Sequence, residues 1–64
     1  MNSINKLKKL ACNGYADAQI KLGGCYYWGH GTEKDRTEAM IWYRKAADNG
    51  SEEAKNKLLE NTQV

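Results

Sequence analysis

The sequence predicts an all-α fold, a short α-solenoid of antiparallel helix pairs formed by a single domain over residues 1–64. Three observations lead to this prediction. The chain repeats part of itself after 36 residues, two Asn-Gly pairs divide it into helix-length segments, and it contains no proline to interrupt those segments. We therefore expect four helices, of which the middle two form one complete repeat and the outer two are half-repeats.

The internal repeat is visible when the chain is compared with itself after a shift of 36 residues. Seven of the fourteen positions from 9 to 22 are then identical. A period of this length accommodates two helices and two connections. The identical pairs are Lys9/Lys45, Ala11/Ala47, Asn13/Asn49, Gly14/Gly50, Ala18/Ala54, Lys21/Lys57 and Leu22/Leu58.

The first two predicted helices cover residues 3–12 and 16–28. Apolar residues recur at the helical period in the first helix, at Ile4, Leu7, Leu10 and Ala11. The second helix has one side that is expected to be buried, formed by Ala18, Leu22, Cys25 and Tyr26. Gly23 and Gly24 each cost about 1 kcal/mol relative to Ala inside a helix. We therefore expect both glycines to permit the close approach of a neighbouring helix.

The last two predicted helices cover residues 36–48 and 52–60. Asp35 is a good N-cap for the first of them, and Glu38 three residues later completes a capping-box pattern. Ser51 caps the second, in which Ala54 and Leu58 are expected to be buried. The pairs Asn13-Gly14 and Asn49-Gly50 end the helices that precede them, because Gly readily takes the left-handed cap conformation. Residues 61–64 are expected to form a frayed tail.

Aromatic and alanine side chains must supply most of the core. Leu, Ile, Val and Phe together are only 9 of the 64 residues, whereas the chain has seven Ala and six aromatic residues. So few aliphatic residues with a high net charge would indicate disorder, but the net charge is only +2. Large rings pack well against small helix faces. We therefore expect Trp42 and Tyr43, from the apolar face Ala39, Trp42, Tyr43 and Ala46, to be core residues.

Positive charge is concentrated in the N-terminal half of the chain, at Lys6, Lys8, Lys9 and Lys21. Lysines on one helix are usually a solvated face. A nucleic-acid-binding domain usually has a denser basic stripe and an isoelectric point above the value of about 8.6 found here. Binding of a nucleic acid or an acidic partner through the first helix is therefore an alternative function and not the main one.

The sequence does not predict catalysis, a metal site or a cofactor. Cys12 and Cys25 are separated by about 15 Å along the chain, too far for a disulfide, and with His30 they lack a short metal-ligand pair. His30 has no nucleophile or carboxylate at a triad spacing, and capping explains Asp35. No apolar run reaches the length of about 18 residues that spans a membrane, and the N-terminus lacks an apolar signal core. We therefore expect a cytoplasmic protein.

An ordered set of residues extends over positions 11–58. Ala18, Leu22-Gly23 and Tyr26 are followed by Gly29-His30-Gly31, Asp35 and Ala39, and then by the run Trp42-Tyr43-Arg44-Lys45-Ala46-Ala47-Asp48-Asn49-Gly50. This set resembles the Sel-1-like repeat family, relatives of the tetratricopeptide repeat, over about three-quarters of the chain. Thr32 and Glu33 depart from the apolar residue and proline that often follow Gly-x-Gly in the family, a change that affects the loop alone. Solenoids usually need about three repeats, so a chain of this length is a marginal monomer, a fragment of a longer solenoid, or a homo-oligomer formed through its exposed terminal helices.

The resemblance implies a non-catalytic protein–protein interaction module, an adaptor or inhibitor, that binds a protein or peptide through its concave helical face. The first helix of each repeat lines that face, so the expected partner-binding residues are Asp17, Ile20, Gly24, Tyr27 and Trp28. Tyr27 and Trp28 follow the packed Tyr26 by about 100° and 200° around the helix, and large exposed aromatic residues are favoured interface anchors. The alternative for Trp28 is packing over the first or third helix. The polar residues expected to tune specificity are Glu53, Asn56 and Glu60.

Overall fold

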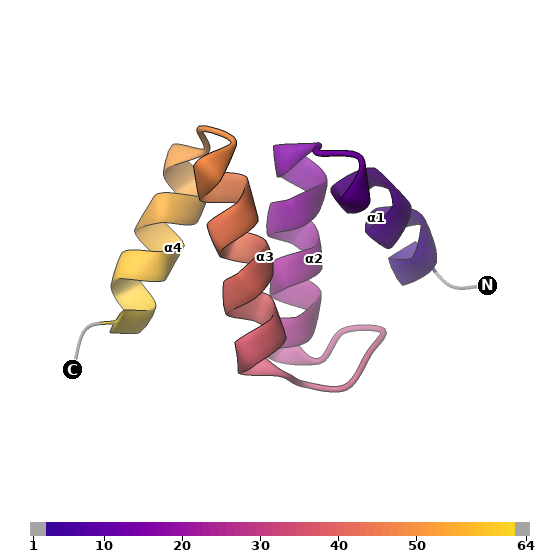
Figure 1. Ribbon diagram of the computed structural model, residues 1–64. Helices are drawn as coiled ribbons and strands as arrows, with labels where there is room; N and C mark the ends of the chain where they lie inside the picture. Colours follow the sequence, from indigo (N-terminus) through magenta and orange to yellow (C-terminus); the bar gives the residue numbers. More distant parts are fainter. Residues whose placement is uncertain (1–2, 63–64) are drawn as a thin grey trace.

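A computed structural model describes residues 3–62 as four helices, with no strand among them. The helices are α1 (Ser3–Cys12), α2 (Ala16–Trp28), α3 (Arg36–Asp48) and α4 (Glu52–Thr62), shown in Figure 1. The predicted all-α class and the bounds of the first three helices are confirmed. The prediction of a tail from residue 61 was wrong for residues 61 and 62, because no Gly or Pro follows Glu60 to stop α4. Residues 63 and 64 lie outside the described part of the chain.

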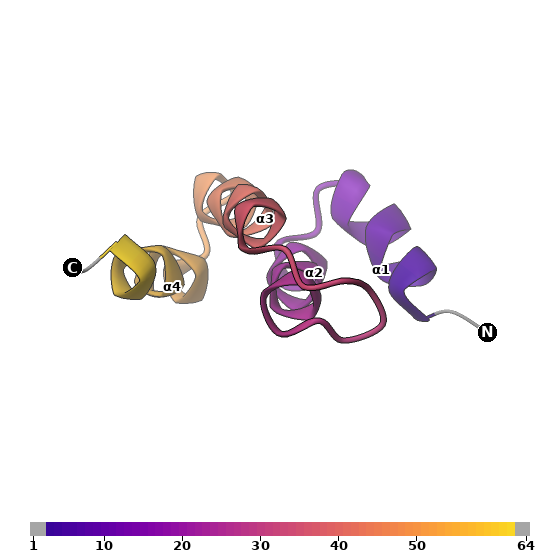
Figure 2. The same ribbon diagram turned by 90° about the horizontal axis from the view of Figure 1, so that it is seen from below.

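The four helices form a row in chain order, and each runs antiparallel to the next (Figure 1). The described chain measures 37 × 23 × 13 Å, and the interface between α2 and α3 is the most extensive of those between helices. Seen from below, α2 and α4 lie on one side of the row, and α1 and α3 lie on the other (Figure 2). The row therefore has one surface built from α2 and α4, which we call the α2–α4 face.

The two Asn-Gly pairs end α1 and α3 in the same way. Gly14 and Gly50 have φ angles of 93° and 95°, in the left-handed region that favours glycine. The amides of Gly14 and Gly50 donate to carbonyls three residues earlier, and those of Tyr15 and Ser51 donate to carbonyls five residues earlier. Both ends are therefore Schellman motifs, which satisfy the last carbonyls of the helix.

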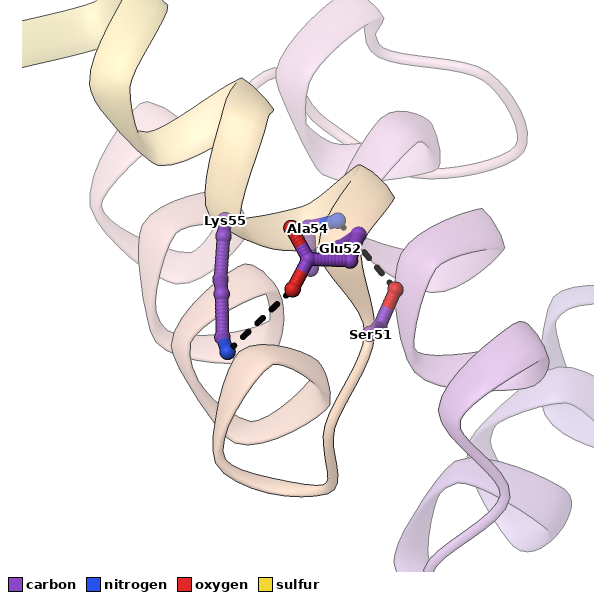
Figure 3. A network of polar contacts seen from close by, with 4 residues as sticks. All are labelled: Ser51, Glu52, Ala54 and Lys55. Carbon is purple, nitrogen blue, oxygen red and sulfur yellow. Dashed lines mark hydrogen bonds and ion pairs between the residues drawn. The ribbon is translucent and has the colours of Figure 1, made fainter.

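The predicted N-caps of α3 and α4 are confirmed. The carboxylate of Asp35 accepts a hydrogen bond of 3.1 Å from the amide of Glu38, and the hydroxyl of Ser51 accepts one of 3.2 Å from the amide of Ala54 (Figure 3). In a complete capping box the side chain of Glu38 would accept a hydrogen bond from the Asp35 amide. That amide donates instead to the Tyr26 carbonyl at 2.8 Å. Figure 3 also shows the exposed ion pair between Lys55 and Glu52, of a kind that contributes little stability.

The tightest contact between α2 and α3 joins Gly23 to the ring of Tyr43. A Cβ atom at Gly23 would lie 2.8 Å from Cε1 and 2.9 Å from Cδ1 of Tyr43, closer than real Cβ atoms approach. The predicted need for a glycine is therefore confirmed at Gly23. At Gly24 the prediction was wrong, because a Cβ there would meet only the Tyr43 hydroxyl, at an ordinary distance of 3.7 Å.

The main core lies between α1, α2 and α3. Its buried cluster comprises Ile4, Ala11, Ala18 and Leu22, and the side chains packed against it are Leu7, Cys25, Tyr26 and Trp42. Tyr43 is buried and Trp42 half-buried, as expected of core residues. Leu10, one of the apolar positions of α1, is 39% exposed. Ala54 is fully buried and Leu58 only half-buried, so the predicted burial of Leu58 was only partly correct.

A chain of three hydrogen bonds joins the two Asn-Gly turns. The buried Gln19 donates from Nε2 to the Ala11 carbonyl at 2.9 Å. Asn49 donates from Nδ2 to Oε1 of Gln19 at 3.1 Å and to the Gly14 carbonyl at 3.2 Å. These bonds fix the turn after α3 against the turn after α1. Moving the turns apart would leave the buried side-chain amide of Gln19 without a partner, which is costly.

Removal of Asn49 is expected to destabilise the fold, whereas removal of its repeat equivalent is not. Asn49→Ala deletes two of the three bonds and leaves Oε1 of the buried Gln19 unpaired, so the free energy of unfolding should fall by about 1 kcal/mol or more. Asn13 occupies the equivalent turn, but its side chain takes no part in these three bonds, so Asn13→Ala should stay within about 0.5 kcal/mol of wild type. Urea denaturation of the two variants measures the difference, and equal losses would contradict a structural role for the network.

Alkaline titration is expected to reveal the burial of Tyr43. Burial raises the pKa of the Tyr43 phenol above its ordinary value of 10.0, and the nearby Tyr27, Glu53 and Cys25 raise it further. Above pH 10.0 the unfolded chain loses a proton that the folded chain retains, so the free energy of unfolding falls as the pH rises through the folded-state pKa. Tyr43→Phe should flatten this fall in urea denaturation. Tyr15→Phe, at a tyrosine that is 60% exposed, should not. The same slope in both variants would show that Tyr43 is not its source.

Candidate functional site

The predicted partner-binding residues of α2 lie along the α2–α4 face. Asp17, Ile20, Gly24 and Tyr27 are spaced by three, four and three residues, which places them on one side of the helix. Trp28 follows in the last turn of α2, directly before the left-handed Gly29 that ends the helix. The structure therefore brings four of the residues to one stripe and adds Trp28 at its end.

The first half of this stripe forms a small hollow with α4. Asp17 and Ile20, together with Lys21 of the same helix and Glu53 of α4, line a space of about 150 Å³. Its lining carries both signs of charge, because it includes Lys21 and the carboxylates of Asp17 and Glu53. This end of the face can offer hydrogen bonds and ion pairs to a partner, together with the apolar side chain of Ile20.

The second half of the stripe is aromatic. Tyr27 and Trp28 form a T-shaped pair with ring centroids 4.7 Å apart, and both line a hollow of about 120 Å³ with Tyr43, Lys57 and Glu60. Trp28 is 66% exposed, so it does not pack over α1 or α3 as the alternative prediction had it. An exposed indole held against a second ring presents a large apolar surface with little freedom to lose on binding.

Two cations of the chain itself lie over the aromatic rings of this hollow. The guanidinium carbon of Arg36 is 4.9 Å from the centre of the Tyr27 ring, and Nζ of Lys57 is 5.9 Å from that of Tyr43. Such contacts contribute about 0.5–1 kcal/mol at exposed sites. They hold the Tyr27 ring from the α3 side and the Tyr43 ring from the α4 side, so the aromatic surface is supported from both neighbouring helices.

Sequence reasoning missed part of this face. Tyr43 was expected only in the core, but its ring passes over Gly23 and reaches the hollow beside Trp28. Lys57 was also missed, although its spacing of four from Glu53 and three from Glu60 is a signal for one helix face. Asn56, which we expected on the same face, is exposed and lines neither hollow.

The other candidate residues do not gather into a site. Within residues 3–62 no group of three or more His, Cys, Asp or Glu is placed to hold a metal ion, and the described helices include none that is long and apolar enough to cross a membrane. His30 is exposed in the loop, and Cys12 and Cys25 are free thiols. The lysines of the basic first helix, Lys6, Lys8 and Lys9, are exposed on α1 and line neither hollow of the α2–α4 face.

Comparison with known proteins identifies the repeat. Over 44 residues the chain is 46% identical to the secretory immunoglobulin A-binding protein EsiB of Escherichia coli O6:H1, an alignment that covers 69% of this chain and 9% of EsiB. The chain thus spans less than a tenth of that relative, and no solved structure matches it. The Sel1 repeat pattern matches residues 16–51, which include all of α2 and α3. Because this match covers more than half of the chain, the protein belongs to the Sel1 repeat family.

Proposed function

We propose that this chain is a non-catalytic adaptor or inhibitor that binds a protein or peptide partner through the α2–α4 face. Sel1 repeats generally mediate protein–protein interaction. The observation that carries the proposal is the exposed Trp28, whose ring packs against the half-buried Tyr27, which Arg36 contacts in turn. Large rigid aromatic side chains beside a mixed-charge rim are typical of the centre of a protein interface.

The relative supports the class of function but not a particular partner. EsiB is named for binding secretory immunoglobulin A, and this chain is similar to 9% of it. The similarity therefore supports binding of a folded protein as the class of function. Lys6, Lys8 and Lys9 on α1 support a second candidate, an acidic partner or a nucleic acid, because all three are exposed.

Replacement of Trp28 is expected to weaken partner binding strongly without unfolding the chain. Affinity capture from a lysate of the native host, with wild-type protein and Trp28→Ala in parallel, should retain a partner on the wild type alone. Affinity for that purified partner should fall by about 30-fold, as for an interface anchor worth about 2 kcal/mol. Tyr15→Ala is a matched control, because Tyr15 is an aromatic residue of similar exposure, 60% against 66%, that lines neither hollow of the face.

Three results would count against this assignment. Equal capture by wild type and Trp28→Ala would show that Trp28 is not an anchor. Loss of capture on replacement of Lys6, Lys8 and Lys9 by Glu, with an affinity that falls steeply with salt, would assign binding to α1 instead. Loss of helical circular dichroism in Trp28→Ala would show that the residue stabilises the fold.

A further inference from the structure

The internal repeat places like charges beside each other on the α2–α4 face. A shift of 36 residues takes Asp17 of α2 to Glu53 of α4, and both carboxylates line the hollow of about 150 Å³, which we call the acidic hollow. Both side chains are exposed, and within residues 3–62 neither takes part in an ion pair. Lys21 sets one positive charge against these two negative ones, so the lining has an excess of negative charge and attracts a cationic side chain.

The acidic hollow also offers apolar contact to such a side chain. Its apolar member is Ile20, which is half-buried. Arg and Lys have long aliphatic stems that pack on apolar surface while the charged head remains at a carboxylate. Of the two, Arg matches a pair of carboxylates better, because its guanidinium presents five donors in a planar fork. The acidic hollow therefore suits an arginine of the partner.

The hollow of about 120 Å³ at the other end of the face, which we call the aromatic hollow, selects a different side chain. The guanidinium carbon of Arg36 lies 4.9 Å from the centre of the Tyr27 ring, and Nζ of Lys57 lies 5.9 Å from that of Tyr43. These two cations would repel a third, and Glu60 is the one carboxylate in the lining that would attract it. A large uncharged side chain can instead pack against the exposed indole of this hollow.

The two hollows follow each other along α2 at a spacing that an extended chain can match. Ile20 of the acidic hollow and Trp28 of the aromatic hollow are eight residues apart, a rise of about 12 Å along the helix. Four residues of an extended chain span about 13 Å. Because side chains alternate between the two sides of such a chain, residues four apart point to the same side. One extended segment can therefore place a side chain in each hollow.

We infer that the partner of this chain presents an extended segment in which an arginine and a large uncharged apolar residue are four positions apart. The arginine enters the acidic hollow, and the apolar residue enters the aromatic hollow against Trp28. Both hollows are smaller than the volume of about 300 Å³ at which small-molecule sites begin, so each suits a single side chain. This inference rests on the proposed function, because it names the occupant of the same face.

The test uses the full chain, labelled with ¹⁵N, and three synthetic peptides in a background of Gly and Ser. The first peptide has one arginine, with a phenylalanine four positions before it and another four positions after it, so that it matches the face in either chain direction. In the second peptide the phenylalanines are three positions from the arginine, on the opposite side of an extended chain. The third peptide has glutamate in place of the arginine of the first.

The first peptide should cause saturable NMR shifts of the Trp28 indole N–H and of the Ile20 amide. The second and third peptides should bind about fivefold or more weakly, because each loses one of the two contacts. The protein variant Asp17→Asn/Glu53→Gln should lose a similar factor for the first peptide. Glu52→Gln should bind it as wild type does, since Glu52 is an exposed glutamate of the same helix turn that lines neither hollow.

Each alternative result overturns the inference. No saturable shift with the first peptide would show that this pattern does not dock on the face. Equal affinities for the first two peptides would show that the spacing is wrong, and tighter binding of the glutamate peptide would assign the face to an acidic segment. The proposed function is tested separately by capture of the native partner. If that capture requires Trp28 while the peptides bind equally, the proposed function stands and the inferred pattern fails.

Discussion

The contact between Gly23 and the ring of Tyr43 is the constraint on which the rest of the structure depends. It lies in the most extensive interface between helices of the described chain, that of α2 with α3, and a Cβ atom at position 23 would force the Tyr43 ring to shift. The same contact directs the Tyr43 ring across α2 to the hollow that Tyr27, Trp28 and α4 surround. One residue therefore serves both the core and the α2–α4 face, and close packing within the repeat sets the shape of the surface available to a partner.

The turns hold successive repeats in register with each other. Two Schellman motifs of the same geometry end α1 and α3, and Asn49 ties the second turn to the first through the buried Gln19. This link places α4 beside α2, which is what creates a face from two helices that are not consecutive in the chain (Figure 2). The repeat equivalents of these two residues differ. Asn13 takes no part in the three bonds, and Lys55 stands in the place of Gln19, with an ammonium group that cannot accept the bond that Asn49 donates to Gln19.

Local signals explain what the sequence could predict. The Asn-Gly pairs, Asp35 and Ser51 act within one turn of their own helix, so helix bounds and caps were predicted correctly wherever such a signal exists. The end of α4 was misplaced because no such signal follows it. The stripe of α2 was predictable from its spacing, but the hollows required knowledge of where α4 lies. The Gln19–Asn49 bond was not predictable, since it joins residues 30 positions apart whose types have no local pattern. The burial of Leu58 was misjudged because it depends on a neighbouring helix.

The most direct test of this account compares the free energy of unfolding of Gly23→Ala and Gly24→Ala. Both substitutions gain about 1 kcal/mol of helix propensity. At Gly23 the added Cβ meets the Tyr43 ring at 2.8 Å, an overpacking that costs about 1–3 kcal/mol, whereas at Gly24 it meets only the hydroxyl at 3.7 Å. The account predicts that Gly24→Ala is at least as stable as wild type and that Gly23→Ala is less stable than Gly24→Ala by the cost of overpacking. Equal stabilities of the two variants would contradict the central role of the Gly23–Tyr43 contact.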